Sequence, residues 1–283
     1  MAESRHSLTV NMHAGVISRG EDWPGARIEV SEVTLATSTT YGGVENLTKR
    51  RDRFFLAMSA VLLLILLVGF APTLYLRMFF DVPPIPFYLH VHGIAVTSWF
   101  VWLLLQASLV NIHRADIHRR IGLAGTVVGV GVVITGLLVT LRIVRRLPEI
   151  GLDLESSIYL VSWIVWANFA MLLAFVVFLS TALVLRRRAV AHKRLMVLAS
   201  MSVIAPALAR IAHWQVFNWI AEPVFVATTW LFLLVVLVLY DLVSARRLQM
   251  VTAVGGSYFA LTVLVPLVVA STDFAQAFVR GLG

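Results

Sequence analysis

The sequence contains no cysteine and is poor in charged residues, which make up only 13% of its 283 residues. The absence of thiols excludes a disulfide framework, a thiolate zinc site, an iron–sulfur cluster and a cysteine nucleophile. A P-loop, a nucleophile elbow and a dinucleotide fingerprint are missing too, which argues against the soluble enzymes that use them. Any bound metal must therefore have histidine, carboxylate or methionine ligands.

Apolar residues make up 59% of the chain, a share typical of proteins that are largely surrounded by lipid. The formal net charge is +8, but residues 1–53 contain seven Lys/Arg and seven Asp/Glu. The positive excess thus lies in or beside the apolar segments. It indicates membrane topology and a bilayer partner, and gives no support for nucleic-acid binding.

Apolar runs of about 20 residues, the length that crosses a hydrocarbon core of about 30 Å, recur along the chain. They predict an all-α polytopic membrane protein with seven transmembrane helices. The predicted spans are 54–76, 88–111, 120–142, 157–185, 194–215, 223–243 and 252–272. Pro72 and Pro206 fall inside two of these spans, where proline is expected to kink the helix.

The distribution of Lys and Arg predicts a cytoplasmic N-terminus and an external C-terminus. In this orientation fourteen cations lie on the cytoplasmic side and six on the other, in agreement with the positive-inside rule. The cytoplasmic cations are Lys49, Arg50, Arg51, Arg53, Arg114, Arg119, Arg120, Arg186, Arg187, Arg188, Lys193, Arg194, Arg246 and Arg247. Residues 1–53 are mixed polar and are expected to form a disordered cytoplasmic tail ahead of a transmembrane domain, 54–283. The sequence leaves open whether Met1 or Met12 is the start.

Histidines lie at both ends of two predicted spans. In the second span His92 and His113 are 21 residues apart, and in the fifth span His192 and His213 have the same separation. At 1.5 Å per residue this spacing is roughly 32 Å, close to the thickness of the hydrocarbon core. Such histidines are expected at the membrane faces and not at mid-membrane.

The two spans run in opposite directions, so the histidines can be sorted by membrane side. His90, His92 and His213 are predicted on the outer side with Arg210 one turn deeper, and His113, His118 and His192 on the inner side. Converging imidazoles suit haem b, Cu, Zn or non-haem Fe, and Arg210 could bind an anionic group such as a propionate. The alternative for the histidines is that they are placed by solvation at the membrane interface or by lipid phosphate, and bind no ligand. The alternative for Arg210 is that its side chain snorkels to the headgroups.

The turns 111–122 and 186–196 are similar to each other, each with a histidine followed by two cations and an apolar helix. Two helix hairpins of the same orientation would make a four-helix core, a common container for a ligand. A chance match between two positive-inside loops is the alternative.

Several segments resemble an uncharacterised family of bacterial inner-membrane proteins. They are Leu89-His90-Val91-His92-Gly93, His118-Arg119-Arg120-Ile121-Gly122 and His192-Lys193-Arg194-Leu195-Met196, within residues 54–250. The last segment, with His213, is also similar to membrane proteins of cytochrome oxidase assembly and, more loosely, to heme A synthase and transmembrane b-type cytochromes. In heme A synthase the pattern implies paired axial histidines from two helix bundles, whereas the fourth span of this chain has none.

The leading functional hypothesis is a membrane redox or cofactor-handling protein. Its outer site would use His92 and His213 with His90 and Arg210, and haem b is the expected occupant; a second site would use His118 and His192. The alternatives are a non-catalytic accessory or assembly subunit of a respiratory or photosynthetic complex and, third, a small-molecule transporter.

Overall fold

The computed structural model describes residues 53–82 and 84–283, and within these ranges the regular structure is helical, without a strand. The predicted tail, 1–53, lies almost wholly outside the described residues, and so does Met12, the alternative start. Six helices are long and apolar enough to cross a membrane: Arg53–Tyr75, α2 (Phe87–Asn111), α3 (Ala115–Leu141), α4 (Ile158–Val184), α7 (Glu222–Ala245) and α8 (Met250–Val269). The prediction of an all-helical chain is confirmed, and its six long apolar helices are those expected of a multi-pass membrane protein.

A seventh crossing is formed only if α5 (Ala189–Ser202) and α6 (Ala205–Ala212) count as one span, because their axes differ by 47°. Pro206 lies in the first turn of α6, where its missing N–H and fixed φ are tolerated. The predicted kink at Pro206 is present. Because the helix axis turns between His192 and His213, these two residues do not lie along one straight helix.

Helix ends differ from the predicted spans where a helix continues beyond its apolar run. Both α3 and α5 begin five residues earlier than predicted, in the polar segments that carry His118 and His192. The first span ends in a π-helical stretch, Ala71–Tyr75, with Pro72 at its start. A short helix that was not predicted, α9 (Asp273–Arg280), is capped by Thr272, whose hydroxyl accepts from the Ala275 amide at 3.2 Å.

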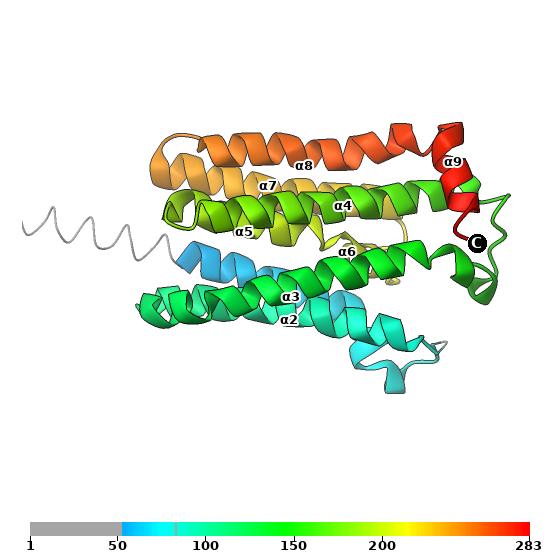
Figure 1. Ribbon diagram of the computed structural model, residues 1–283, viewed down its shortest axis with the longest axis horizontal. Coiled ribbons are helices and arrows are strands. Elements are labelled where there is room, and N and C mark those ends of the chain that lie inside the picture. The colour runs from blue at the N-terminus through cyan, green and yellow to red at the C-terminus, as the bar shows by residue number, and fades with distance from the viewer. Residues whose placement is uncertain (1–52, 83) are drawn as a thin grey trace, which may run out of the picture. The chain divides into compact units, whose positions relative to one another are not determined.

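Two antiparallel hairpins, α2–α3 and α4–α5, form much of the bundle. In Figure 1 the α2–α3, α4–α5 and α7–α8 turns lie at the same end, which we call the basic end because these turns carry Arg114, Arg186 to Arg188, Arg246 and Arg247. The 76–86 and 142–157 connections lie at the opposite end, which we call the far end. The hairpins therefore have the same orientation, as the similarity of their turns predicts.

The core between these helices is apolar with a few satisfied polar groups. Trp99 of α2 is 1% exposed, stacks edge-on against Phe175 of α4 and donates its indole N–H to Ser200 of α5 at 3.1 Å. The first span approaches α6 at Gly69, where an added Cβ would overlap the backbone carbonyl of Ala207. Close backbone contact at small residues is a usual basis for helix association in lipid.

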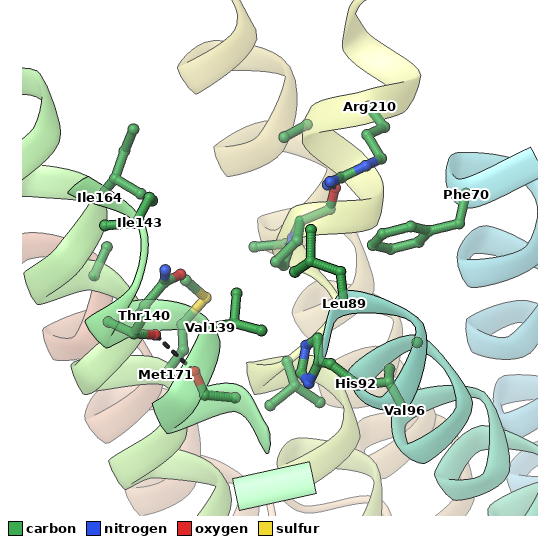
Figure 2. Close-up of a pocket in the computed structure, with 18 of the residues that line it drawn as sticks. Phe70, Leu89, His92, Val96, Val139, Thr140, Ile143, Ile164, Met171 and Arg210 are labelled. Atoms are coloured by element: carbon green, nitrogen blue, oxygen red, sulfur yellow. Dashed lines mark hydrogen bonds between the residues drawn. The ribbon is translucent and has the colours of Figure 1, made fainter. Parts of the chain in front are cut away.

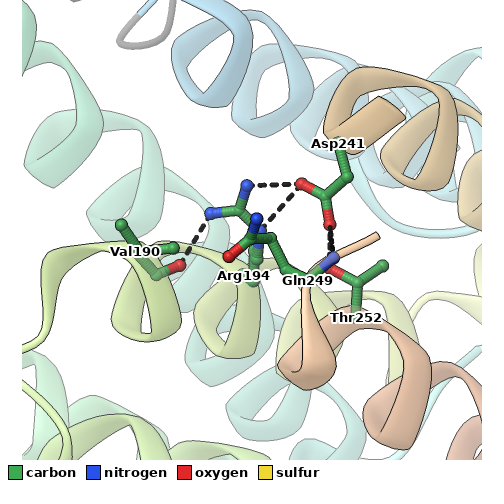
Figure 3. Close-up of polar contacts among 5 residues, drawn as sticks. All are labelled: Val190, Arg194, Asp241, Gln249 and Thr252. Atoms are coloured by element: carbon green, nitrogen blue, oxygen red, sulfur yellow. Dashed lines mark hydrogen bonds and ion pairs between the residues drawn. The ribbon is translucent and has the colours of Figure 1, made fainter. Parts of the chain in front are cut away.

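A buried ion pair connects three helices near the basic end (Figure 3). Arg194 of α5 donates from Nε to Oδ1 of Asp241 on α7 at 2.9 Å, and its terminal nitrogen contacts the same oxygen. The other carboxylate oxygen of Asp241 accepts from the Thr252 hydroxyl of α8 at 2.6 Å and from the Gln249 amide at 3.3 Å. Because the hydrogen-bonding groups on both sides have partners, we interpret this pair as a structural clamp.

Candidate functional site

A cavity of about 640 Å³ lies between the helices in the far half of the bundle. Its walls come from the end of the first span, the start of α2, the end of α3, the first half of α4, the α5–α6 break and the start of α7, with Thr262 and Val263 of α8. The lining is mostly aliphatic and aromatic, with a few polar groups. This volume and composition are typical of small-molecule and cofactor sites.

His92 presents one ring nitrogen to this cavity (Figure 2). Its Nδ1 is 2.9 Å from the hydroxyl of Thr135, and that hydroxyl donates its proton to the Gly131 carbonyl at 2.7 Å. The hydroxyl can therefore only accept from His92, which fixes the proton on Nδ1 and leaves a lone pair on Nε2. In the described part of the chain, Nε2 has no hydrogen-bond partner. This is the arrangement that holds a histidine as a metal ligand.

Arg210 is the cation that reaches the same cavity from α6 (Figure 2). Its guanidinium lies 4.2 Å above the Phe70 ring and donates to the Pro206 carbonyl at 2.9 Å. Among the described residues no carboxylate is within ion-pair distance of it. A half-buried guanidinium that stacks on an aromatic ring and has no anionic partner is suited to bind an anionic ligand group.

The other charged groups at the cavity are already paired. Arg146 contacts Glu149 at 3.1 Å, and Glu222 contacts Nε2 of His213 at 2.8 Å. Arg210 is therefore the cavity-lining cation without an ion-pair partner among the described residues, and Glu222 acts on it electrostatically only from beyond ion-pair distance. One polar atom of a lining residue, the Thr73 hydroxyl, is also buried without a partner among the described residues.

The structure does not gather the predicted outer histidines around one point. His92 lines the cavity, whereas the His213 side chain is 71% exposed and paired with Glu222. His90 lies outside the lining, with Nδ1 at 3.4 Å from its own helix at Pro86. Within residues 53–82 and 84–283 no three His, Cys, Asp or Glu side chains form a group able to hold a metal ion. Of the predicted outer set, the cavity thus combines His92 with Arg210.

The two inner histidines, by contrast, lie together. The rings of His118 and His192 are 6.3 Å apart between centroids and nearly perpendicular, at 84°. Nδ1 of His192 is 2.9 Å from the Ala182 carbonyl, and Nδ1 of His118 is buried without a partner. His113, which was predicted on the same side, is exposed in the α2–α3 turn with a positive φ of 62°.

Two contributors to the cavity, Thr135 and Phe70, have no clear signal in the sequence, whereas Asp241 of the buried ion pair has one. Thr135 is a threonine inside an apolar run, and nothing in its spacing connects it with His92 at 43 positions' distance. Phe70 is one of 16 phenylalanines. Asp241 could have been found, since a carboxylate within an apolar span needs a cationic partner.

Comparisons with protein-family models, with curated proteins and with solved structures give no match to this chain. The function is therefore inferred from the chemistry of the cavity and the histidine pair.

Proposed function

We propose that this chain is a membrane redox or cofactor-handling protein that binds haem b in the far-half cavity, with His92 as the iron ligand. The single observation that carries the proposal is the position of His92. Its Nδ1 proton is directed to Thr135 and its Nε2 lone pair is directed to an apolar cavity. Haem would supply reversible one-electron chemistry at the iron.

The residues of the cavity fit this group in shape and charge. A porphyrin has a flat apolar body that suits the aliphatic and aromatic walls, and two propionates that need a cation. Arg210 would bind a propionate, because it is the lining cation without a carboxylate partner in the described residues, and its stacking on Phe70 holds the guanidinium in place. His213 is outside this ligand set, so the proposal is a single protein ligand and not a pair of histidines.

We further propose seven spans with the N-terminus in the cytoplasm of a bacterial inner membrane. With the N-terminus in the cytoplasm, the basic end would be cytoplasmic and the cavity would be in the outer half, and counting α5 and α6 as one bent span would put the C-terminus outside. The concentration of Lys and Arg in the turns at the basic end supports this orientation. Reporter fusions after residue 188 and after residue 283 should report the cytoplasm and the outside, respectively.

The haem proposal is tested by titrating the purified protein in detergent with haemin. The wild type should give a Soret band that saturates at one haem per chain, and His92→Ala should abolish it. Thr135→Val should weaken binding roughly 10- to 100-fold, since it removes the partner that fixes the ring. His90→Ala, two positions away but outside the cavity, is the matched control and should bind as the wild type. A Soret band that survives His92→Ala at full strength would overturn the proposal.

Small-molecule transport is a second candidate, favoured by one observation. The break between α5 and α6 contributes Val203, Ala205 and Pro206 to the cavity wall, and transporters commonly bind substrates at such interrupted helices. Uptake of an anionic amphiphile into proteoliposomes that depends on Arg210, without haem binding, would favour transport. Co-purification with a larger respiratory or photosynthetic complex that survives His92→Ala would favour an accessory subunit.

A further inference from the structure

We infer that His118 and His192 form a second site, at the basic end, that binds a single monovalent copper ion. This inference does not rest on the proposed haem cavity, which lies in the other half of the bundle. The two histidines occupy equivalent places in the two hairpins, each in the first turn of a helix that follows a basic turn. The chain thus brings two like side chains from similar motifs to one place.

Each ring has a nitrogen lone pair available for a metal. Nδ1 of His192 donates to the Ala182 carbonyl, so its Nε2 carries the lone pair. The His118 ring lies beside the backbone carbonyl of Gln106, and since its Nδ1 is buried without a partner, Nε2 is the nitrogen that can donate to that carbonyl. A carbonyl that accepts from the non-ligating ring nitrogen, as Ala182 does at His192, is the usual partner of a metal-binding histidine.

The separation of the rings selects the coordination geometry. The metal–nitrogen distance is about 2.0 Å, and the distance from the nitrogen to the centre of an imidazole ring is about 1.15 Å. Two imidazoles bound to one ion therefore have ring centroids about 6.3 Å apart when the nitrogen–metal–nitrogen angle is 180°, and about 5.1 Å apart when this angle is tetrahedral. The observed value is 6.3 Å. With Nδ1 of His118 and Nε2 of His192 turned toward one ion, this separation corresponds to a near-linear nitrogen–metal–nitrogen arrangement, which suits a d¹⁰ monovalent copper ion better than tetrahedral zinc.

The charges around the pair also favour a monovalent ion. Among residues 53–82 and 84–283 no carboxylate joins the two histidines in a metal-binding group, while Arg119 and Lys193 lie close enough to act electrostatically on His118. A divalent ion with two neutral ligands would face stronger repulsion from these cations than a monovalent ion would. Soft ligands favour Cu(I), and Met196 follows His192 by four residues, which places its thioether on the same face of α5.

The buried amide of Gln106 is the second sign that something is bound here. This side chain is 9% exposed, and both its oxygen and its nitrogen are buried without a hydrogen-bond partner. Gln106 also places its backbone carbonyl beside the His118 ring, and buried amide and imidazole atoms without partners are costly unless an ion or an ordered molecule completes their interactions.

The test is an anaerobic titration of the purified full chain with Cu(I) against a chromophoric chelator. One ion per chain should bind, and His118→Ala and His192→Ala should each lower the affinity at least tenfold. His113→Ala, an exposed histidine at the same end, is the matched control and should bind as the wild type. Met196→Leu, a volume-conserving change, should weaken binding without affecting folding, and therefore tests the site even if a histidine variant misfolds.

Three results would overturn the inference: no stoichiometric Cu(I) binding, binding unchanged by both histidine variants, or Zn(II) binding as tight as Cu(I). His92→Ala separates this site from the haem proposal. It should remove haem and leave Cu(I) binding intact, whereas His118→Ala should do the reverse.

Discussion

Replacing Asp241 by alanine should be one of the most destabilising single changes in this protein. The side chains of Arg194 and Asp241 are 6% and 0% exposed, and the carboxylate accepts from the guanidinium, the Thr252 hydroxyl and the Gln249 amide. Asp241→Ala leaves a buried guanidinium without its counter-charge and two further donors without an acceptor. Removing one partner of a buried ion pair costs about 3–5 kcal/mol. This cost lowers the folding equilibrium constant by a factor of roughly 100 to 3,000.

The free energy of unfolding should be measured in mixed micelles by SDS titration followed by tryptophan fluorescence. Asp116→Ala is the matched control, because it removes an exposed ion pair with Arg114 that is worth about 0–1 kcal/mol. The double variant Arg194→Met/Asp241→Leu should recover most of the loss, since apolar side chains of similar size replace a buried pair at little cost. The clamp is refuted if Asp241→Ala costs no more than Asp116→Ala, or if the double variant is less stable than both single variants.

Two smaller predictions concern packing and pH. Gly69→Ala should cost about 1–3 kcal/mol, because the new methyl group overlaps the Ala207 carbonyl, whereas Gly131→Ala, with nothing within 4 Å, should be neutral or slightly stabilising in the same SDS titration. The Arg280 guanidinium, bonded to Glu155 at 2.9 and 3.0 Å, holds the pKa of that carboxyl below its usual range. A carboxyl group whose pKa is lower in the folded protein than in the unfolded chain, where it is about 4.3, stabilises the fold at pH values above 4.3. This stabilisation is lost as the pH falls through the pKa of the folded protein, so hydrogen-exchange protection of α9 should drop below about pH 4. Glu155→Gln should remove that pH dependence, and an unchanged profile in this variant would contradict the assignment.

The long helices could be predicted because a lipid solvent leaves a strong signal in the sequence. Backbone groups in a hydrocarbon core must be paired within the segment, so each apolar run of sufficient length becomes a helix. The ends of those helices were less predictable. Helices α3 and α5 extend into polar residues that hydropathy excludes, and α9 depends on a local cap at Thr272.

The angle between α5 and α6 explains why His213 lies outside the cavity that His92 lines. Pro206 marks the kink in the sequence, but a proline does not specify which way the following helix turns. After the turn His213 lies at the surface beside Glu222. His192 lies before the kink, and His118 lies in the equivalent turn of the other hairpin. Their proximity therefore follows from the similarity of the two turns, which is visible in the sequence.

The environment of His92 was beyond sequence reasoning for a different reason. His92 was predicted to be a cofactor ligand because it lies at the membrane interface. That position does not determine the direction in which each ring nitrogen points. That direction depends on Thr135 of α3, a contact between residues 43 positions apart. Such contacts follow from tertiary packing and have no period or motif that could reveal them.

The most direct test of the central claim is the haem content of the protein as purified from membranes, measured by the pyridine haemochrome spectrum for the wild type, His92→Ala and His213→Ala. We predict about one haem b per chain for the wild type and for His213→Ala, and none for His92→Ala. Absence of haem from all three, or loss of haem in His213→Ala with retention in His92→Ala, would contradict the assignment of His92 as the ligand.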